Sequence, residues 1–84
     1  MSMNEWNNEL HNDLMLIFKS YRKWNSSIEK ALLKLGFEIE RKKDNHIKII
    51  FYVKGIKKIV ILASTASDKN AGLQTIRMIR RQFN

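Results

Sequence analysis

The chain has 84 residues, with sixteen Lys and Arg against eight Asp and Glu, so its formal net charge at pH 7 is +8. It contains no cysteine, which excludes disulfide scaffolds, thiolate zinc sites, iron–sulfur clusters and cysteine nucleophiles. Its length fits one domain with a small core, and its charge favours an anionic partner: nucleic acid, a membrane surface or an acidic protein.

Neither a secretory signal nor a membrane span is expected. Residues 1–8 are polar and lack the basic and apolar regions of a signal peptide. The most apolar stretch, residues 47–63, is interrupted by lysines, whereas a transmembrane helix needs about 20 consecutive, mostly apolar residues. Because the lack of cysteine also suits a reducing compartment, we expect a soluble cytoplasmic protein that does not bind a membrane.

Helical periodicity predicts two helices in the first part of the chain. The first is expected from about residue 5 to residue 24, with an apolar stripe at spacings of mostly three and four. The second should begin near Asn25 or Ser26, where Ser26 and Glu29 have the spacing of a capping box. It should end at Gly36, which suits a left-handed C-cap.

After Gly36 the apolar period changes to two, which predicts strands at residues 37–42, 46–53 and 56–63. Asp44 and Asn45 predict a turn, and Lys54-Gly55 predicts a short hairpin connection. A last helix should follow a cap at Ser67 or Asp68. The order α-α-β-β-β-α predicts an α+β fold, in which a three-stranded antiparallel sheet carries helices on one face and the first helix adds a further layer.

Most of the positive charge follows residue 35. Residues 36–84 contain eleven basic and four acidic side chains, a net of +7, whereas residues 1–35 have a net of +1. This distribution predicts a phosphate-binding surface on the sheet and the last helix, although a solvated basic face is the alternative. The candidate nucleic-acid-binding residues are Lys42, Lys43, Lys48, Tyr52, Lys57, Lys58, Arg77 and Arg81, with Tyr52 suited either to stacking on a base or to packing.

His46 is the main candidate for chemistry. Histidine transfers protons near neutral pH, and metal-free RNA cleavage needs a base for the 2′-hydroxyl and cations for the developing charge. His46 lies between Lys42, Lys43 and Lys48, which could supply those cations, although a solvent-facing histidine is the alternative. No two potential metal ligands have a recognisable spacing, so we expect no metal and no cofactor.

The stretch Ala31-Leu32-Leu33-Lys34-Leu35-Gly36-Phe37-Glu38-Ile39 is followed by a basic segment, His46 at the start of a strand, a hairpin and a last helix. This pattern, over residues 26–84, resembles the HicA toxins of HicA–HicB toxin–antitoxin systems. The resemblance implies a fold like that of double-stranded-RNA-binding domains, a metal-independent ribonuclease acting on mRNA through His46, and a HicB-like antitoxin as partner. One departure is that Asp44-Asn45-His46 replaces the family's usual Gly-Ser-His.

We therefore expect a single domain over residues 1–84, with an additional N-terminal helix in residues 1–25 and a HicA-like core in residues 26–84. The favoured function is RNA binding, with cleavage by His46 as the catalytic hypothesis. Two alternatives stay open at this point. One is a non-catalytic nucleic-acid-binding module of phage or mobile-element origin. The other is a protein-interaction domain with an acidic partner.

Overall fold

The computed structural model of the chain describes residues 2–3, 5–19, 21–65 and 70–83. The fold is α+β, and its helices and longer strands follow the predicted order α-α-β-β-β-α. A two-residue strand that the sequence did not predict comes before them. In chain order the elements are β1 (Ser2–Met3), α1 (Asn8–Phe18), α2 (Ser26–Lys34), β2 (Glu38–Arg41), β3 (His46–Val53), β4 (Ile56–Ala63) and α3 (Ala71–Arg81).

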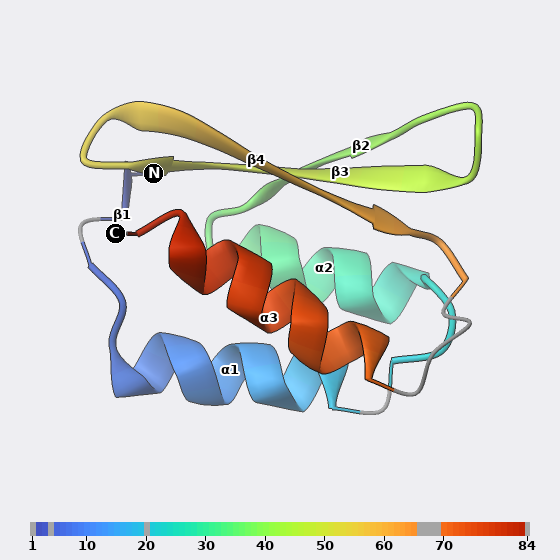
Figure 1. The fold of residues 1–84 in the computed structure, drawn as a ribbon, viewed down its shortest axis with the longest axis horizontal. Helices are drawn as coiled ribbons and strands as arrows, with labels where there is room; N and C mark the ends of the chain where they lie inside the picture. Colours follow the sequence, from blue (N-terminus) through green and yellow to red (C-terminus); the bar gives the residue numbers. More distant parts are fainter. Residues whose placement is uncertain (1, 4, 20, 66–69, 84) are drawn as a thin grey trace.

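The sheet is built around β3, as Figure 1 shows. Strand β4 pairs antiparallel with β3 along all eight of its residues, from His46 opposite Ala63 to Val53 opposite Ile56. On the other edge of β3, β2 pairs antiparallel with residues 47–50, and β1 pairs parallel with residues 52–53. The predicted three-stranded antiparallel meander is thus confirmed, and β1 adds a short parallel strand to it.

Two tight turns connect these strands. Lys54 and Gly55 both have positive φ, 53° and 81°, as a two-residue hairpin that matches the twist of its strands requires. The turn between β2 and β3 contains Asn45 with φ 65°, and the Lys42 N–H donates to the His46 carbonyl across it. Both predicted turns are therefore present, and the second places His46 at the start of β3.

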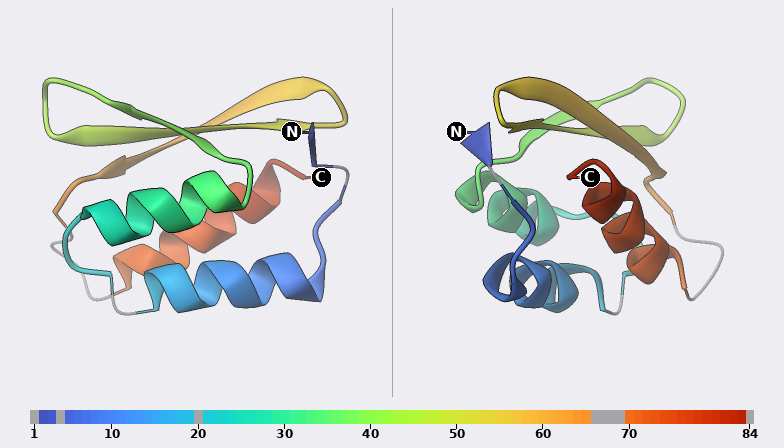
Figure 2. Two further views of the ribbon diagram at one scale, coloured as in Figure 1. Left: turned by 180° about the vertical axis from the view of Figure 1, so that it is seen from behind. Right: turned by 60° about the vertical axis from the view of Figure 1, so that its left-hand side comes forward.

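All three helices lie on one side of the sheet, in two layers (Figures 1 and 2). Helices α2 and α3 lie next to the sheet, and α1 lies beyond them. Alternate residues of β3 face this side and are buried, and they pack with apolar residues of the helices. The largest fully buried side chains of this core include Leu14, Phe18, Leu32, Phe37, Ile49, Phe51 and Ile79.

Helix α1 is shorter than predicted, because it ends at Phe18 rather than near residue 24. Tyr21 and Trp24 are nevertheless buried, in the connection between α1 and α2. The Tyr21 hydroxyl donates to the Ala63 carbonyl at 2.6 Å, which ties this connection to the end of β4. Burial raises the pKa of the Tyr21 hydroxyl above its ordinary value, so it remains a donor at neutral pH.

Helix α2 begins at Ser26, and its N-cap is Asn25, one residue before the Ser26 that the capping box predicted. Asn25 is the N-cap: its backbone is extended, and its Oδ1 accepts from the Ile28 N–H at 3.0 Å. At the other end Gly36 has φ 100°, and the N–H groups of Gly36 and Phe37 donate to the carbonyls of Leu33 and Leu32. This left-handed cap confirms the predicted helix end.

The caps predicted for the last helix, Ser67 and Asp68, lie outside the described residues. Helix α3 begins at Ala71 and packs through Gly72, Thr75, Ile76 and Ile79. Among the described residues, no helix has the length and hydropathy that crossing a membrane requires.

Candidate nucleic-acid interface

The His46 imidazole is held by Asp44, two residues before it in the β2–β3 turn. Its Nδ1 lies 3.1 Å from the Asp44 carbonyl oxygen and 3.2 Å from the Asp44 Oδ1. Because both neighbours are oxygen acceptors, Nδ1 carries a proton and donates it. In the neutral ring this leaves Nε2 as the basic nitrogen, and nearly half of the side chain is exposed to solvent.

Asp44 responds to the same contact. The hydrogen bond from His46 lowers the pKa of the Asp44 carboxyl below its ordinary value, and the positive charge of Lys42 acts in the same direction. The carboxylate therefore stays ionised, and able to accept from Nδ1, to a lower pH than an isolated aspartate would.

His46 borders a hollow of about 230 Å³ at the end of the sheet, which we call the His46 hollow. It has room for several water molecules at about 30 Å³ each, and hence for a phosphate group. Three of its lining side chains are cations, and among the described residues that line it there is no carboxylate. Its main lining residues are Lys23, Trp24, Arg41, Lys42, His46 and Ser64.

Backbone hydrogen bonds hold the α1–α2 connection against this hollow. The Trp24 N–H donates to the Ser64 carbonyl at 2.7 Å, and the Ser64 N–H donates to the Asn45 carbonyl at 2.8 Å. Lys23 also forms an isolated antiparallel bridge with Thr65. Because Asn45 directly precedes His46, Ser64 fixes the position of Lys23 relative to the β2–β3 turn.

Trp24 forms part of the wall of this hollow and is 7% exposed. Its indole Nε1 is buried and has no hydrogen-bond partner among the described residues. A buried N–H without a partner costs roughly 1–3 kcal/mol, so this donor would gain from an acceptor.

Arg41 has a second contact outside the hollow, where its Nε lies 3.6 Å from the Glu29 Oε1. Glu29 was predicted to complete a capping box, but it instead faces the first strand of the meander. The Arg41 side chain is 61% exposed, so an exposed ion pair of this kind contributes little to stability. Its charge is therefore still available to an anion in the hollow.

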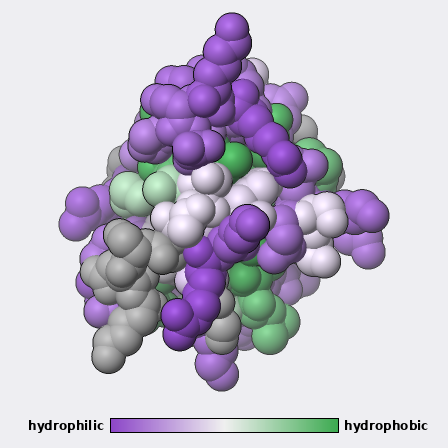
Figure 3. Space-filling model, turned by 90° about the vertical axis from the view of Figure 1, so that its right-hand side faces the viewer, coloured by the Kyte–Doolittle hydropathy of each residue, from purple (hydrophilic) through white to green (hydrophobic). Residues whose placement is uncertain are grey.

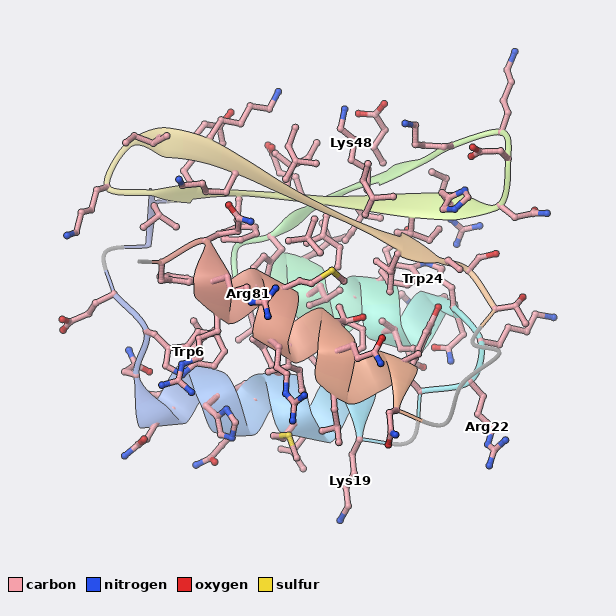
Figure 4. All side chains as sticks on the ribbon, in the orientation of Figure 1. Trp6, Lys19, Arg22, Trp24, Lys48 and Arg81 are labelled. Carbon is pink, nitrogen blue, oxygen red and sulfur yellow. The ribbon has the colours of Figure 1, made fainter. Side chains whose placement is uncertain are left out.

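The predicted binding residues do not form one surface. Lys42 lines the His46 hollow, and Lys43 is exposed in the adjoining turn. Lys48 lies on the sheet face away from the helices, where Figure 4 shows it pointing outward, and its Nζ is 4.0 Å from the Glu40 Oε2. Tyr52 and Lys57 are paired with each other on that face, six residues along β3 from His46. Six residues of strand span roughly 20 Å.

The remaining candidates lie on the helix side of the molecule. Lys58 is opposite the buried Phe51, which places it on the inner side of β4, where it is half-buried. Arg77 and Arg81 are exposed on α3. Lys42 and Lys43 therefore lie with His46 at one end of the sheet, whereas the other candidates are distributed over the outer face of the sheet, the inner side of β4 and α3.

Sequence reasoning missed Lys23, Trp24, Arg41 and Ser64 as lining residues. Lys23 and Trp24 were placed on a helix that in fact ends at Phe18. Ser64 reaches the hollow through hydrogen bonds with Trp24 and Asn45, which lie 40 and 19 positions before it in the chain. No local pattern in the sequence reveals such contacts. Arg41 could have been identified from the sequence, because it directly precedes the candidate binding residues Lys42 and Lys43.

In the described part of the chain, no group of three or more His, Asp or Glu side chains is placed so that it could hold a metal ion.

Figure 3 shows the end of the molecule that carries the hollow, where hydrophilic side chains surround a paler centre.

No family model, curated protein or solved structure matches the chain.

Proposed function

We propose that this chain is a cytoplasmic RNA-binding protein of HicA-like type, and that it cleaves mRNA at the His46 hollow without a metal ion. The observation that carries the proposal is the combination of His46, oriented through Nδ1 by Asp44, with a hollow lined by Lys23, Arg41 and Lys42. An oriented base beside clustered cations is what phosphodiester cleavage by the neighbouring 2′-hydroxyl requires.

The proposed reaction uses Nε2 of His46 as the general base. It removes the proton of the ribose 2′-hydroxyl, and the resulting oxygen attacks the adjacent phosphorus. The bond from phosphorus to the 5′ oxygen breaks, and that oxygen leaves with a proton from solvent. The products are a 2′,3′-cyclic phosphate and a 5′-hydroxyl end, while the cations that line the hollow offset the extra negative charge of the transition state.

The resemblance to HicA toxins also supports a protein partner for this chain. We propose a HicB-like antitoxin that binds the chain and blocks its activity. Co-expression with a neighbouring gene product that restores growth would support this partner, whereas growth inhibition that no neighbouring gene relieves would contradict it.

The test is cleavage of end-labelled RNA in EDTA by the wild type and by His46→Ala. Loss of a general base should lower the rate roughly 10²- to 10⁴-fold. His11→Ala is the matched control, because His11 is the only other histidine and lies on α1. Its rate should equal that of the wild type.

RNA binding by His46→Ala should persist, because Lys23, Arg41 and Lys42 remain in the hollow. A His46→Ala protein that cleaves at the wild-type rate would overturn the catalytic assignment. A wild type that binds RNA with a steep salt dependence but yields no products would instead identify a non-catalytic nucleic-acid-binding module.

A further inference from the structure

A second hollow adjoins the His46 hollow and shares Lys23 with it. We call it the α1–α2 hollow, because it lies where α1 ends and α2 begins, and its volume is about 480 Å³. The shared lysine makes the two hollows neighbours on one end of the molecule. The residues of this second hollow that matter here are Leu16, Ile17, Lys19, Arg22, Lys23 and Ser27.

Among the described residues, no carboxylate is paired with the cations of the α1–α2 hollow. In the described ranges, no Asp or Glu lies within 4.0 Å of the charged groups of Lys19, Arg22 or Lys23. Arg41 and Lys48, by contrast, each have such a partner. Figure 4 shows Lys19 pointing outward from the end of α1, away from the sheet, and Arg22 pointing outward at the end of the molecule that carries Trp24.

The walls of this hollow also suit a nucleotide better than a simple anion. Leu16 is 82% exposed beside the cations, so an apolar surface is available to a base or a sugar. The first turn of α2 also borders the hollow through Ser27. Asn25 accepts from the Ile28 N–H, and this first turn carries the positive end of the α2 dipole.

We propose that a bound RNA strand continues from the His46 hollow over Lys23 into the α1–α2 hollow, where Lys19 and Arg22 bind the neighbouring phosphates. The proposal rests on the proposed function, which puts the first phosphate beside His46. It places the extended footprint on the connection between α1 and α2, not on Arg77 and Arg81 of α3. A single strand fits this path, because it can bend over Lys23 from one hollow into the next.

The experiment measures the affinity of fluorescein-labelled single-stranded RNA of roughly eight nucleotides over a series of salt concentrations. All proteins carry His46→Ala, so that the RNA stays intact. Lys19→Ala/Arg22→Ala is compared with Lys30→Ala/Lys34→Ala, which removes the same charge from exposed positions of α2. Each pair includes one cation at or just after a helix C-terminus, so dipole effects on stability are matched.

Loss of two phosphate contacts should reduce the slope of log affinity against log salt by about 1.4, since each contact contributes about 0.7 for single strands. The α2 control pair should leave the slope close to that of the parent. With a dinucleotide, which fills only the His46 hollow, the two double variants should bind equally.

Thermal unfolding of each variant shows whether a loss of affinity reflects a loss of folded protein. If Lys19→Ala/Arg22→Ala is destabilised, Lys19→Gln/Arg22→Gln replaces it, because glutamine removes the charge but keeps a longer, polar side chain than alanine does. Parent-like binding of the octanucleotide by a folded variant would overturn the inference while leaving the proposed function intact. No binding of RNA by the parent would overturn the proposed function itself, and preference for an acidic polypeptide over RNA would also do so.

Discussion

At the scale of single residues, the turn before His46 contains no glycine and depends on Asn45 instead. A tight turn here needs a residue in the left-handed region, and Asn45 supplies it with φ 65°. Asparagine is one of the few non-glycine residues that adopt this conformation readily. Asp44 would be expected to repel a phosphate, but it also accepts from His46 Nδ1 and so fixes the ring.

These two effects of Asp44 can be separated by Asp44→Asn. The amide oxygen is a weaker acceptor for Nδ1, so the imidazole is held less firmly and cleavage should slow by about tenfold, which corresponds to the loss of about one hydrogen bond. RNA binding should tighten at the same time, because a negative charge beside the phosphate is removed. Single-turnover rates and binding curves measured on the same RNA check both directions.

The matched control is Asp13→Asn, which removes the same charge from α1. It should leave the cleavage rate unchanged. Faster cleavage by Asp44→Asn would show that repulsion of the substrate outweighs orientation of His46, and would contradict the positioning role.

At the scale of secondary-structure elements, the position of α3 depends on a glycine near its start. A Cβ on Gly72 would clash with the Phe18 carbonyl oxygen and would lie 3.2 Å from the Tyr21 Cβ. The end of α1 and the start of α3 therefore approach closely at this point. Glycine is used here for its small size, despite its cost to an isolated helix of about 1 kcal/mol relative to alanine.

Gly72→Ala should consequently destabilise the protein, against the usual effect of this substitution in a helix. Overpacking against backbone that cannot move away costs roughly 1–3 kcal/mol, and the measurement is the free energy of unfolding from urea titration. Gly55→Ala is a useful comparison, because no described residue comes within 4 Å of its added Cβ, so the strain there comes from its φ of 81°. A Gly72→Ala protein that is more stable than the parent would contradict this account of the α1–α3 contact.

The elements that the sequence predicted well are those determined by local pattern. The bounds of β3 and β4 follow from alternation and from Lys54-Gly55, and the end of α2 follows from Gly36. The end of α1 was not predictable in this way, because Tyr21 and Trp24 continue the helical spacing although they lie in a connection. Their burial depends on contacts with β4 and Ser64, about 40 residues away.

The candidate site likewise contains residues that local sequence predicts and residues that it does not. His46 and Lys42 could be proposed from their neighbours in the chain, since both belong to one turn. Lys23 could not, because it reaches the hollow only through the bridge to Thr65 and the Ser64 hydrogen bonds. A site assembled from distant segments requires the fold before its members can be identified.

At the scale of the whole molecule, segment charge proved a poor guide to where cations gather. Residues 36–84 hold most of the net charge, yet their basic side chains are spread over the turn, both faces of the sheet and α3. The two adjoining hollows instead combine cations from both parts of the chain. The N-terminal segment is therefore bound to the rest of the fold by the same contacts that shape the hollows.

That dependence predicts that residues 26–84 alone will not fold stably, although they contain all three helix-covered antiparallel strands, β2, β3 and β4. The missing segment supplies Leu14, Phe18, Tyr21 and Trp24 to the core. Removing a single buried Phe or Trp side chain costs about 3–5 kcal/mol, and small domains have only about 5–15 kcal/mol in total. Thermal unfolding followed by circular dichroism and by NMR chemical-shift dispersion should show no cooperative transition for residues 26–84. The full chain should show one by both methods. A sigmoidal transition that both methods report for the shorter chain would establish residues 26–84 as an autonomous domain, and α1 would then be an accessory.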